Sequence, residues 1–270
     1  MLGSDIMPFT GFAMTDLIIF NTPCAPVTFV GAGPGAAQHL TLGALRALQE
    51  ADVVVHDRLV GAEVIGLIPA GTHRIDVGKE GFGPSTAQNT INAVLVAEAL
   101  AGRRVVRLKG GDVGIFGRLD EEIEALEAAG LAFAILPGLT TATVAAAAIG
   151  QSLTKRGRNK SLRIVTGHDM AGFADLDWRG LAQNGEVAAI YMGKKSARFV
   201  QGRLLMHGAA PATEITVVEN VSRPDQKIWA GTLATLAQTT SQAAGPAVIL
   251  FGLAPRLAAK AVNTLKEAHA

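Results

Sequence analysis

The sequence predicts an α/β fold made of two α/β domains with a cleft between them. Short β-branched runs alternate with helical periods in the first half of the body, an alternation that favours a largely parallel sheet. A second series of strands follows an interruption at Pro137-Gly138. Ligand sites tend to form between such units. The expected division is an irregular extension at 1–24, domains at 25–138 and 139–257, and a C-terminal helix or tail at 258–270.

The first half contains five expected strands, at Val27–Gly31, Asp52–His56, Arg74–Gly78, Arg104–Lys109 and Ala132–Leu136. Between them, apolar residues recur at helical spacing after Thr41, after Pro84-Ser85-Thr86 and around Ile123. Gly130 is typical of the end of the third helix.

The second half begins with an Ala-rich helix at Thr141–Ile149, followed by a basic stretch at residues 154–160. Four further strands are expected, at Leu162–Thr166, Val187–Met192, Glu214–Glu219 and Ala247–Phe251. The chain therefore resembles two α/β units joined by a short linker.

Composition excludes several classes of protein. Of the 270 residues 49% are hydrophobic and 17% charged, which excludes general disorder. A net charge of +1 is too balanced for a general nucleic-acid binder, and no apolar run is long enough for a membrane span. The single cysteine, Cys24, forms no internal disulfide and favours a reducing compartment, so we expect a cytoplasmic protein. The six histidines show no metal-ligand spacing, so no metal site is expected.

The turn Gly31-Ala-Gly-Pro-Gly35 follows the first strand and, with Ala36, satisfies the dinucleotide fingerprint. Asp52 or Asp57 would be the acidic residue about 20 positions on. Pro34 argues against this interpretation, because it removes an amide donor where a pyrophosphate needs one. A tight turn that requires small residues, or an NAD-dependent oxidoreductase, both remain open at this point.

The segment Arg107–Asp112 ends a strand with two glycines, which allow a ligand to approach the main chain. Asp112 is suited to bind ribose hydroxyls or a ligand ammonium, or alternatively to cap the next segment. Arg118 and Glu121 are three apart at a helix start and share one face. A solvated ion pair is the alternative interpretation of those two residues.

Five cations without an acid follow the Ala-rich helix, at Lys155, Arg156, Arg158, Lys160 and Arg163. Such a cluster suits a polycarboxylate or phosphate ligand, because guanidinium groups bind carboxylates bidentately. A solvated loop is the alternative. Nucleic acid is a weaker interpretation, because no aromatic residues are interleaved.

Taken in order, these segments resemble the tetrapyrrole methylases from about Val27 to Gly252. The resemblance lies in Val30–Gly35, His56–Val60, Val77-Gly-Lys79, Arg107–Asp112, Ile115–Arg118, Pro137-Gly138, Leu153–Gly157, Tyr191-Met-Gly193 and Glu219-Asn220. Arg223-Pro-Asp-Gln226 is one of the elements that favour the members acting on uroporphyrinogen III over those acting on later corrin rings.

The resemblance implies two α/β domains, a homodimer, and S-adenosylmethionine folded in the cleft, with S-adenosylhomocysteine as product. The residues that it assigns to the cofactor site are Pro34, Gly110, Gly111, Asp112, Ile115, Thr140, Thr141, Met192 and Val221. A sulfonium cofactor has no pyrophosphate, so its binding does not need the amide donor that Pro34 lacks. The flat face of the Pro34 ring also suits adenine.

The activity implied is transfer of two methyl groups to ring carbons of uroporphyrinogen III, giving precorrin-2. By resemblance Asp57 is the base and Lys79 the acid, Arg118 and Glu121 hold or deprotonate the substrate, and Arg156 binds a carboxylate. A methylase of a later precorrin is the nearest alternative. The chain departs from the family pattern at Val113, Gly114, Leu119, Asp120 and Val221.

Overall fold

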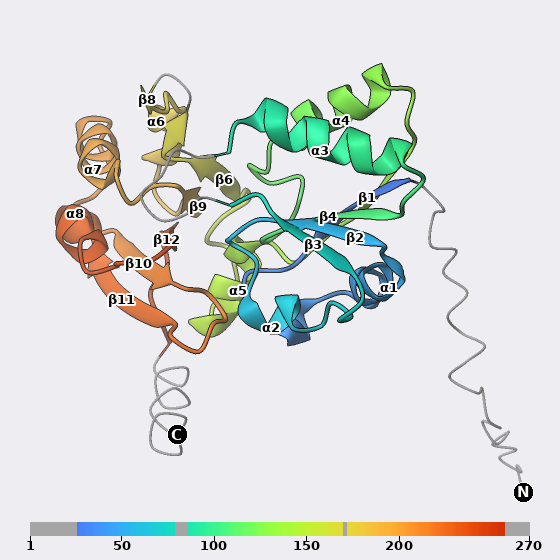
Figure 1. The fold of residues 1–270 in the computed structure, drawn as a ribbon. Coiled ribbons are helices and arrows are strands. Elements are labelled where there is room, and N and C mark those ends of the chain that lie inside the picture. The colour runs from blue at the N-terminus through green and yellow to red at the C-terminus, as the bar shows by residue number, and fades with distance from the viewer. Residues whose placement is uncertain (1–25, 79–85, 170–171, 257–270) are drawn as a thin grey trace, which may run out of the picture.

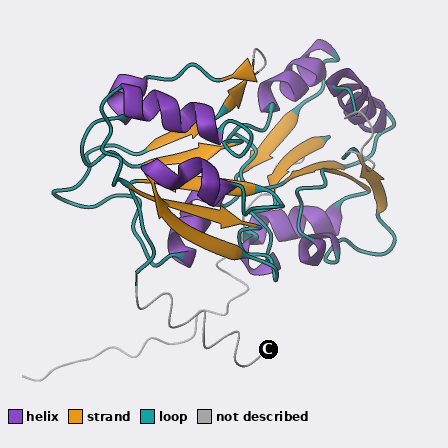
Figure 2. Cartoon of the chain, turned by 90° about the vertical axis from the view of Figure 1, so that its left-hand side faces the viewer, coloured by secondary structure: helices purple, strands orange, loops and turns teal. Residues whose placement is uncertain are grey.

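The computed structural model describes residues 26–78, 86–169 and 172–256 (Figure 1). Lys79, Cys24 and the segments expected at 1–24 and 258–270 lie outside the described residues. The described chain forms two five-stranded sheets and one small two-stranded hairpin. Figure 2 shows the strands of both sheets in the interior with helices around them.

The first sheet is wholly parallel, with the strand order β3-β2-β4-β1-β5. Its strands are β1 (Val27–Gly31), β2 (Val53–His56), β3 (His73–Asp76), β4 (Val105–Lys109) and β5 (Phe133–Leu136). This arrangement confirms the α/β class with a parallel sheet. Parallel strands leave their carboxyl ends at one edge, where ligands bind in open α/β sheets.

Helices cover both faces of the first sheet (Figure 1). Val54 and Val106 pack on the side of α1 (Leu42–Glu50) and α2 (Ala62–Ile65). Val53 and Val55 pack on the side of α3 (Gln88–Leu100) and α4 (Leu119–Ala128). Adjacent residues therefore serve opposite faces, as the two-residue period of a strand requires.

The helix starts were predicted with mixed success. Thr41 caps α1, and its Oγ1 accepts a hydrogen bond from the N–H of Ala44 at 3.1 Å. Of the expected start at Pro84-Ser85-Thr86, Pro84 and Ser85 lie outside the described residues; α3 itself begins at Gln88 after Ala87, which has no side-chain acceptor. Gly130 follows α4 with a φ of 67°, the left-handed conformation that glycine adopts easily.

The second sheet is mixed, with the strand order β11-β10-β12-β9-β6. Its strands are β6 (Arg163–Thr166), β9 (Ala188–Tyr191), β10 (Glu214–Glu219), β11 (Lys227–Thr232) and β12 (Ala247–Phe251). Only the β6–β9 pair is parallel. The edge strand β11 was not expected from the sequence. The hairpin consists of β7 (His168–Asp169) and β8 (Gly172–Phe173).

Helices also cover both faces of the second sheet. On one face α5 (Thr141–Ala148) packs against β12, through a cluster that includes Val248 and Leu250. The other face is covered by α6 (Trp178–Leu181), α7 (Ala197–Met206) and α8 (Leu236–Thr240). Two short 3₁₀ helices complete the chain, η1 (Ala37–His39) and η2 (Leu233–Thr235). None of the helices in the described ranges is long and apolar enough to cross a bilayer.

Candidate active site at the strand ends

The carboxyl ends of β1, β4 and β5 meet main chain to main chain. The N–H of Gly33 donates to the carbonyl of Gly111 at 3.1 Å, and the N–H of Gly111 donates to the carbonyl of Gly33 at 2.7 Å. A Cβ added to Gly31 would collide with the backbone of Gly138, so only glycine permits this approach. Backbone atoms of three loops therefore pack together at the sheet edge where ligands bind in open α/β sheets.

Asp112 fixes the loop that leaves β4. Its Oδ1 accepts from the N–H of Gly114 and its Oδ2 from the N–H of Gly138, both at 2.9 Å. The capping role considered from the sequence is therefore present. Each carboxylate oxygen can accept a further hydrogen bond, so this loop role leaves room for a ligand hydroxyl or ammonium.

The glycine turn after β1 does not lead into an α-helix. It is followed by η1, and α1 begins only at Leu42. Asp52 lies at the other end of the sheet, where it pairs with Arg104 at 2.9 Å. The dinucleotide interpretation depends on a pyrophosphate at a helix N-terminus next to the glycines, and this turn offers none.

The second unit contributes Tyr191, at the end of β9. Its Oη lies 2.5 Å from Thr140 Oγ1 and accepts a hydrogen bond from the N–H of Ala142 at 2.8 Å. The ring of Phe116, in the loop after β4, lies 5.4 Å from the ring of Tyr191. Tyr191 therefore joins the loops of both units, a role that the sequence did not reveal.

Backbone strain is concentrated in the loops after β4, β9 and β10. The non-glycine residues with positive φ in the described chain are Phe116, Arg118, Met192, Asn220 and Ser222. Such residues cluster at ligand sites, where the surrounding structure holds an unfavourable conformation in place. Met192 is 50% exposed, and Val221 is buried. The Oδ1 of Asn220 is buried without a hydrogen-bond partner among the described residues.

Arg118 and Glu121 form the ion pair that their spacing predicts. Arg118 Nε donates to Glu121 Oε1 at 2.7 Å and Nη2 donates to Oε2 at 2.6 Å. This bidentate bond lowers the pKa of Glu121 and raises that of Arg118. The pair borders a hollow of about 300 Å³ lined by residues 113–114 and 116–121.

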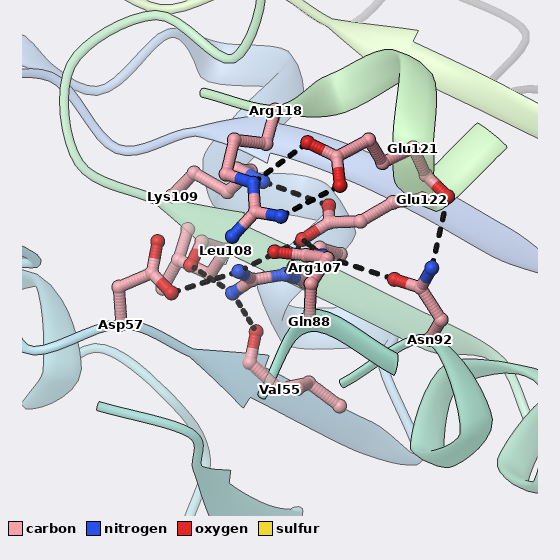
Figure 3. Close-up of polar contacts among 10 residues, drawn as sticks. All are labelled: Val55, Asp57, Gln88, Asn92, Arg107, Leu108, Lys109, Arg118, Glu121 and Glu122. Carbon is pink, nitrogen blue, oxygen red and sulfur yellow. Dashed lines mark hydrogen bonds and ion pairs between the residues drawn. The ribbon is translucent and has the colours of Figure 1, made fainter. Parts of the chain in front are cut away.

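A buried ion cluster lies beneath that pair (Figure 3). Glu122, whose side chain is 0% exposed, accepts from Arg107 at 3.1 Å and from Lys109 at 2.8 Å. Gln88 donates to the same carboxylate at 3.2 Å. Arg107 Nη2 also donates to Asp57 Oδ1 at 2.8 Å, and the Asp57 side chain is 28% exposed. Asp57 is therefore the partly exposed carboxylate of an otherwise buried cluster.

The electrostatics of the cluster depend on its pairing. Burial lowers the pKa of Lys109, the nearby charge of Arg107 lowers it further, and Glu122 opposes both effects. Removing one partner would leave an uncompensated charge in the interior. The sequence did carry a signal for this cluster, because Arg107 and Lys109 alternate with apolar residues on a central strand and so share one face.

The basic stretch after α5 is partly neutralised by acidic residues from other segments. Arg163 pairs with Asp177 at 2.9 Å and with Glu186 at 3.2 Å, acids supplied by distant segments. Arg156 is exposed, and no contact among the described residues joins it to Asp57 or Arg118. Two acids from other parts of the sequence therefore neutralise Arg163, which lies in β6.

The other residues assigned by resemblance lie in the turn after β1, in the loop after β4 and at the start of α5. Pro34 is buried, while Gly110, Ile115, Thr140 and Thr141 are half-buried. No group of three or more metal-ligating side chains occurs within the described ranges.

Fold and site together define a protein of two α/β units whose loops meet at the carboxyl ends of the first sheet. The chain matches the tetrapyrrole (corrin/porphyrin) methylases over residues 26–237. It is 46% identical over 235 residues to a siroheme synthase of Edwardsiella ictaluri, covering 86% of this chain and 51% of that protein. It is 44% identical over 232 residues to siroheme synthase 3 of Aeromonas hydrophila, covering 86% of this chain and 50% of that protein. The chain thus spans about half the length of these curated relatives.

Solved structures agree with this assignment. A uroporphyrin-III C-methyltransferase from Thermus thermophilus, complexed with S-adenosylhomocysteine, is 34% identical with a TM-score of 0.73, covering 84% of this chain and 96% of that one. A cobalt precorrin-4 methyltransferase has the same fold at 24% identity, with a TM-score of 0.73, and covers 84% of this chain and 94% of that one. The chain belongs to the tetrapyrrole methylase family.

Proposed function

We propose that the chain transfers methyl groups from S-adenosylmethionine to two ring carbons of uroporphyrinogen III, one after the other, and so forms precorrin-2. The observation that carries this proposal is the likeness to a uroporphyrin-III C-methyltransferase over 96% of that protein's length. The loops that resemble the family are also the loops that meet at the carboxyl ends of β1, β4 and β5.

The residues present fit an adenosyl cofactor. The close backbone packing of Gly31, Gly111 and Gly138 fixes the loops that would hold the cofactor. Asp112 retains acceptor capacity for hydroxyls or an ammonium. Bound there, the cofactor would supply an electrophilic methyl group on a sulfonium sulfur.

The chain's own residues would orient the acceptor and manage the proton. A pyrrole carbon is already electron-rich, so alignment accounts for much of the rate. Arg118 would bind a carboxylate of the substrate, because its fork fits a carboxylate bidentately and Glu121 now occupies that fork. Asp57 would accept the released proton at Oδ2, since Oδ1 is bound by Arg107.

Further features of the proposal come from the resemblance and from composition. Arg156 would bind a second carboxylate, and Lys79 would act as the acid. We also propose a homodimer, and a cytoplasmic location that rests on the single cysteine.

The test is incubation of the chain with S-adenosylmethionine and uroporphyrinogen III under reducing conditions, followed by mass spectrometry. We expect a gain of two methyl groups. A gain only with a later precorrin would replace the substrate, and tight binding of a nicotinamide cofactor without S-adenosylhomocysteine binding would overturn the proposal.

A further inference from the structure

The turn between β10 and β11 contains Arg223-Pro-Asp-Gln226, a sequence element without an assigned role. The turn is rigidly built. The N–H of Ser222 donates to Gln226 Oε1 at 2.7 Å, and the N–H of Arg223 donates to the carbonyl of Asn220 at 2.9 Å. Asn220 and Ser222 both adopt positive φ, at 49° and 61°. A strained turn with internal hydrogen bonds holds its side chains in fixed directions.

This turn of the second unit contacts the glycine turn of the first. The N–H of Ala36 donates to Ser222 Oγ at 3.0 Å. A Cβ added to Gly35 would lie 2.6 Å from Cγ of Arg223 and 3.0 Å from the carbonyl oxygen of Val221. The two turns therefore pack without a gap, although they are 186 positions apart at this hydrogen bond.

Arg223 also reaches the loop that carries Asp57. Its Nη2 donates to the carbonyl of Leu59 at 2.8 Å. The same carbonyl oxygen lies close to Gly110, where an added Cβ would be 2.9 Å away. The N–H of Val60 donates to the carbonyl of Asp57 at 3.2 Å, so Asp57 to Val60 form one turn. A guanidinium donor binds a carbonyl more strongly than a neutral donor does.

We propose that Arg223 is a positioning residue, which fixes the Asp57 loop from the second α/β unit. Arg107 holds the Asp57 carboxylate from within the first unit, and Arg223, from the second unit, holds the main chain of the same turn at Leu59. Asp57 is thereby fixed relative to both halves of the site. The inference rests on the proposed function only where Asp57 is taken as the base.

The test compares Arg223→Ala and Arg223→Lys with a matched control, Arg74→Ala. Arg74 Nη2 donates to the carbonyl of Ile68 at 2.6 Å, the same kind of bond within the first unit alone. The readouts are kcat and KM with uroporphyrinogen III, the affinity for S-adenosylhomocysteine, and hydrogen exchange at the Val60 amide, which reports opening of the Asp57 turn.

We expect Arg223→Ala to lower kcat about tenfold or more, because small displacements of a reacting group are costly. Affinity for S-adenosylhomocysteine should stay within about threefold, Val60 exchange should rise, and free guanidinium at low concentration should restore part of kcat. Arg223→Lys should lie between Arg223→Ala and wild type, and Arg74→Ala should match wild type.

Unchanged Val60 exchange in Arg223→Ala, or an equal rise in Arg74→Ala, would overturn the inference. If the wild-type chain transfers no methyl group, the proposed function fails, while the Val60 exchange of the two alanine variants still decides the positioning role.

Discussion

Glu121 and Glu122 are neighbours in the first turn of α4, yet they belong to two different electrostatic systems. Glu122 is fully buried and binds Arg107 and Lys109, whereas the Glu121 side chain is 47% exposed and binds Arg118. Water screens the exposed pair, so it adds little to stability and its partners can exchange for a ligand. The buried pair cannot exchange without leaving a charge in the interior. The same helix turn therefore presents one carboxylate that stabilises the fold and one that is accessible to a ligand.

The largest effect on stability is expected at Glu122. We expect Glu122→Gln to lower the free energy of unfolding by about 3–5 kcal/mol, because Arg107 and Lys109 lose their shared buried anion. Urea unfolding at neutral pH measures this loss. The matched control is Glu121→Gln, which should leave the unfolding midpoint unchanged. Equal effects of the two variants would show that burial does not distinguish these carboxylates.

Arg118 tests the other half of the comparison. Arg118→Ala should lower kcat at least about a hundredfold, because the residue would align a substrate carboxylate. The unfolding midpoint should not change, and the affinity for S-adenosylhomocysteine should stay within a few-fold. Kinetics and a binding titration check both points. Loss of cofactor affinity together with turnover would mean that Arg118 has another role.

Met192 extends the comparison to the second unit, as an exposed residue in a strained loop. Met192→Ala should weaken S-adenosylhomocysteine binding by about 1–3 kcal/mol, the usual range for one lost contact. The control is Met206→Ala, an exposed methionine at the end of α7. Calorimetric titration of both variants gives the difference, and equal affinities would place Met192 outside the cofactor site.

The smallest effect is expected at Asp52, in an exposed pair at the opposite end of the sheet. Hydrogen bonds from Arg104 lower the pKa of Asp52 from 3.8 to about 2. A depressed carboxyl pKa gives stability above the unfolded value, and that stability is lost as pH falls through the folded value. Wild type should therefore lose its small advantage over Asp52→Asn, at most about 1 kcal/mol, as pH falls from 3.8 to about 2. Acid unfolding curves of both forms would show parallel slopes if the pair contributed nothing.

Local patterns were enough to predict the five strands of the first sheet, although not their order. The run Val27–Gly31 is β1 as expected, and β2, β4 and β5 begin one residue later than predicted. The edge strand β11 was missed because Lys227–Thr232 alternates poorly and includes Gly231. Its antiparallel pairing with β10 makes the second sheet mixed.

The site was predictable only where its contacts are local. The three-residue spacing of Arg118 and Glu121 predicts their pairing on a helix face. Arg107 reaches Asp57 across 50 positions and Arg223 reaches Leu59 across 164. No period or spacing rule joins such residues, because tertiary packing alone brings them together.

The left-handed residues of the strand-end loops have a consequence for protein engineering. Substitution of any of these five residues by glycine would relieve backbone strain, since a side chain makes the left-handed region unfavourable by about 1–2 kcal/mol. A screen for heat tolerance would thus select glycine at Met192 or Asn220, and these substitutions would relax the loops after β9 and β10. We expect survivors of such selection to be robust and catalytically slow, and a useful library would leave these positions untouched.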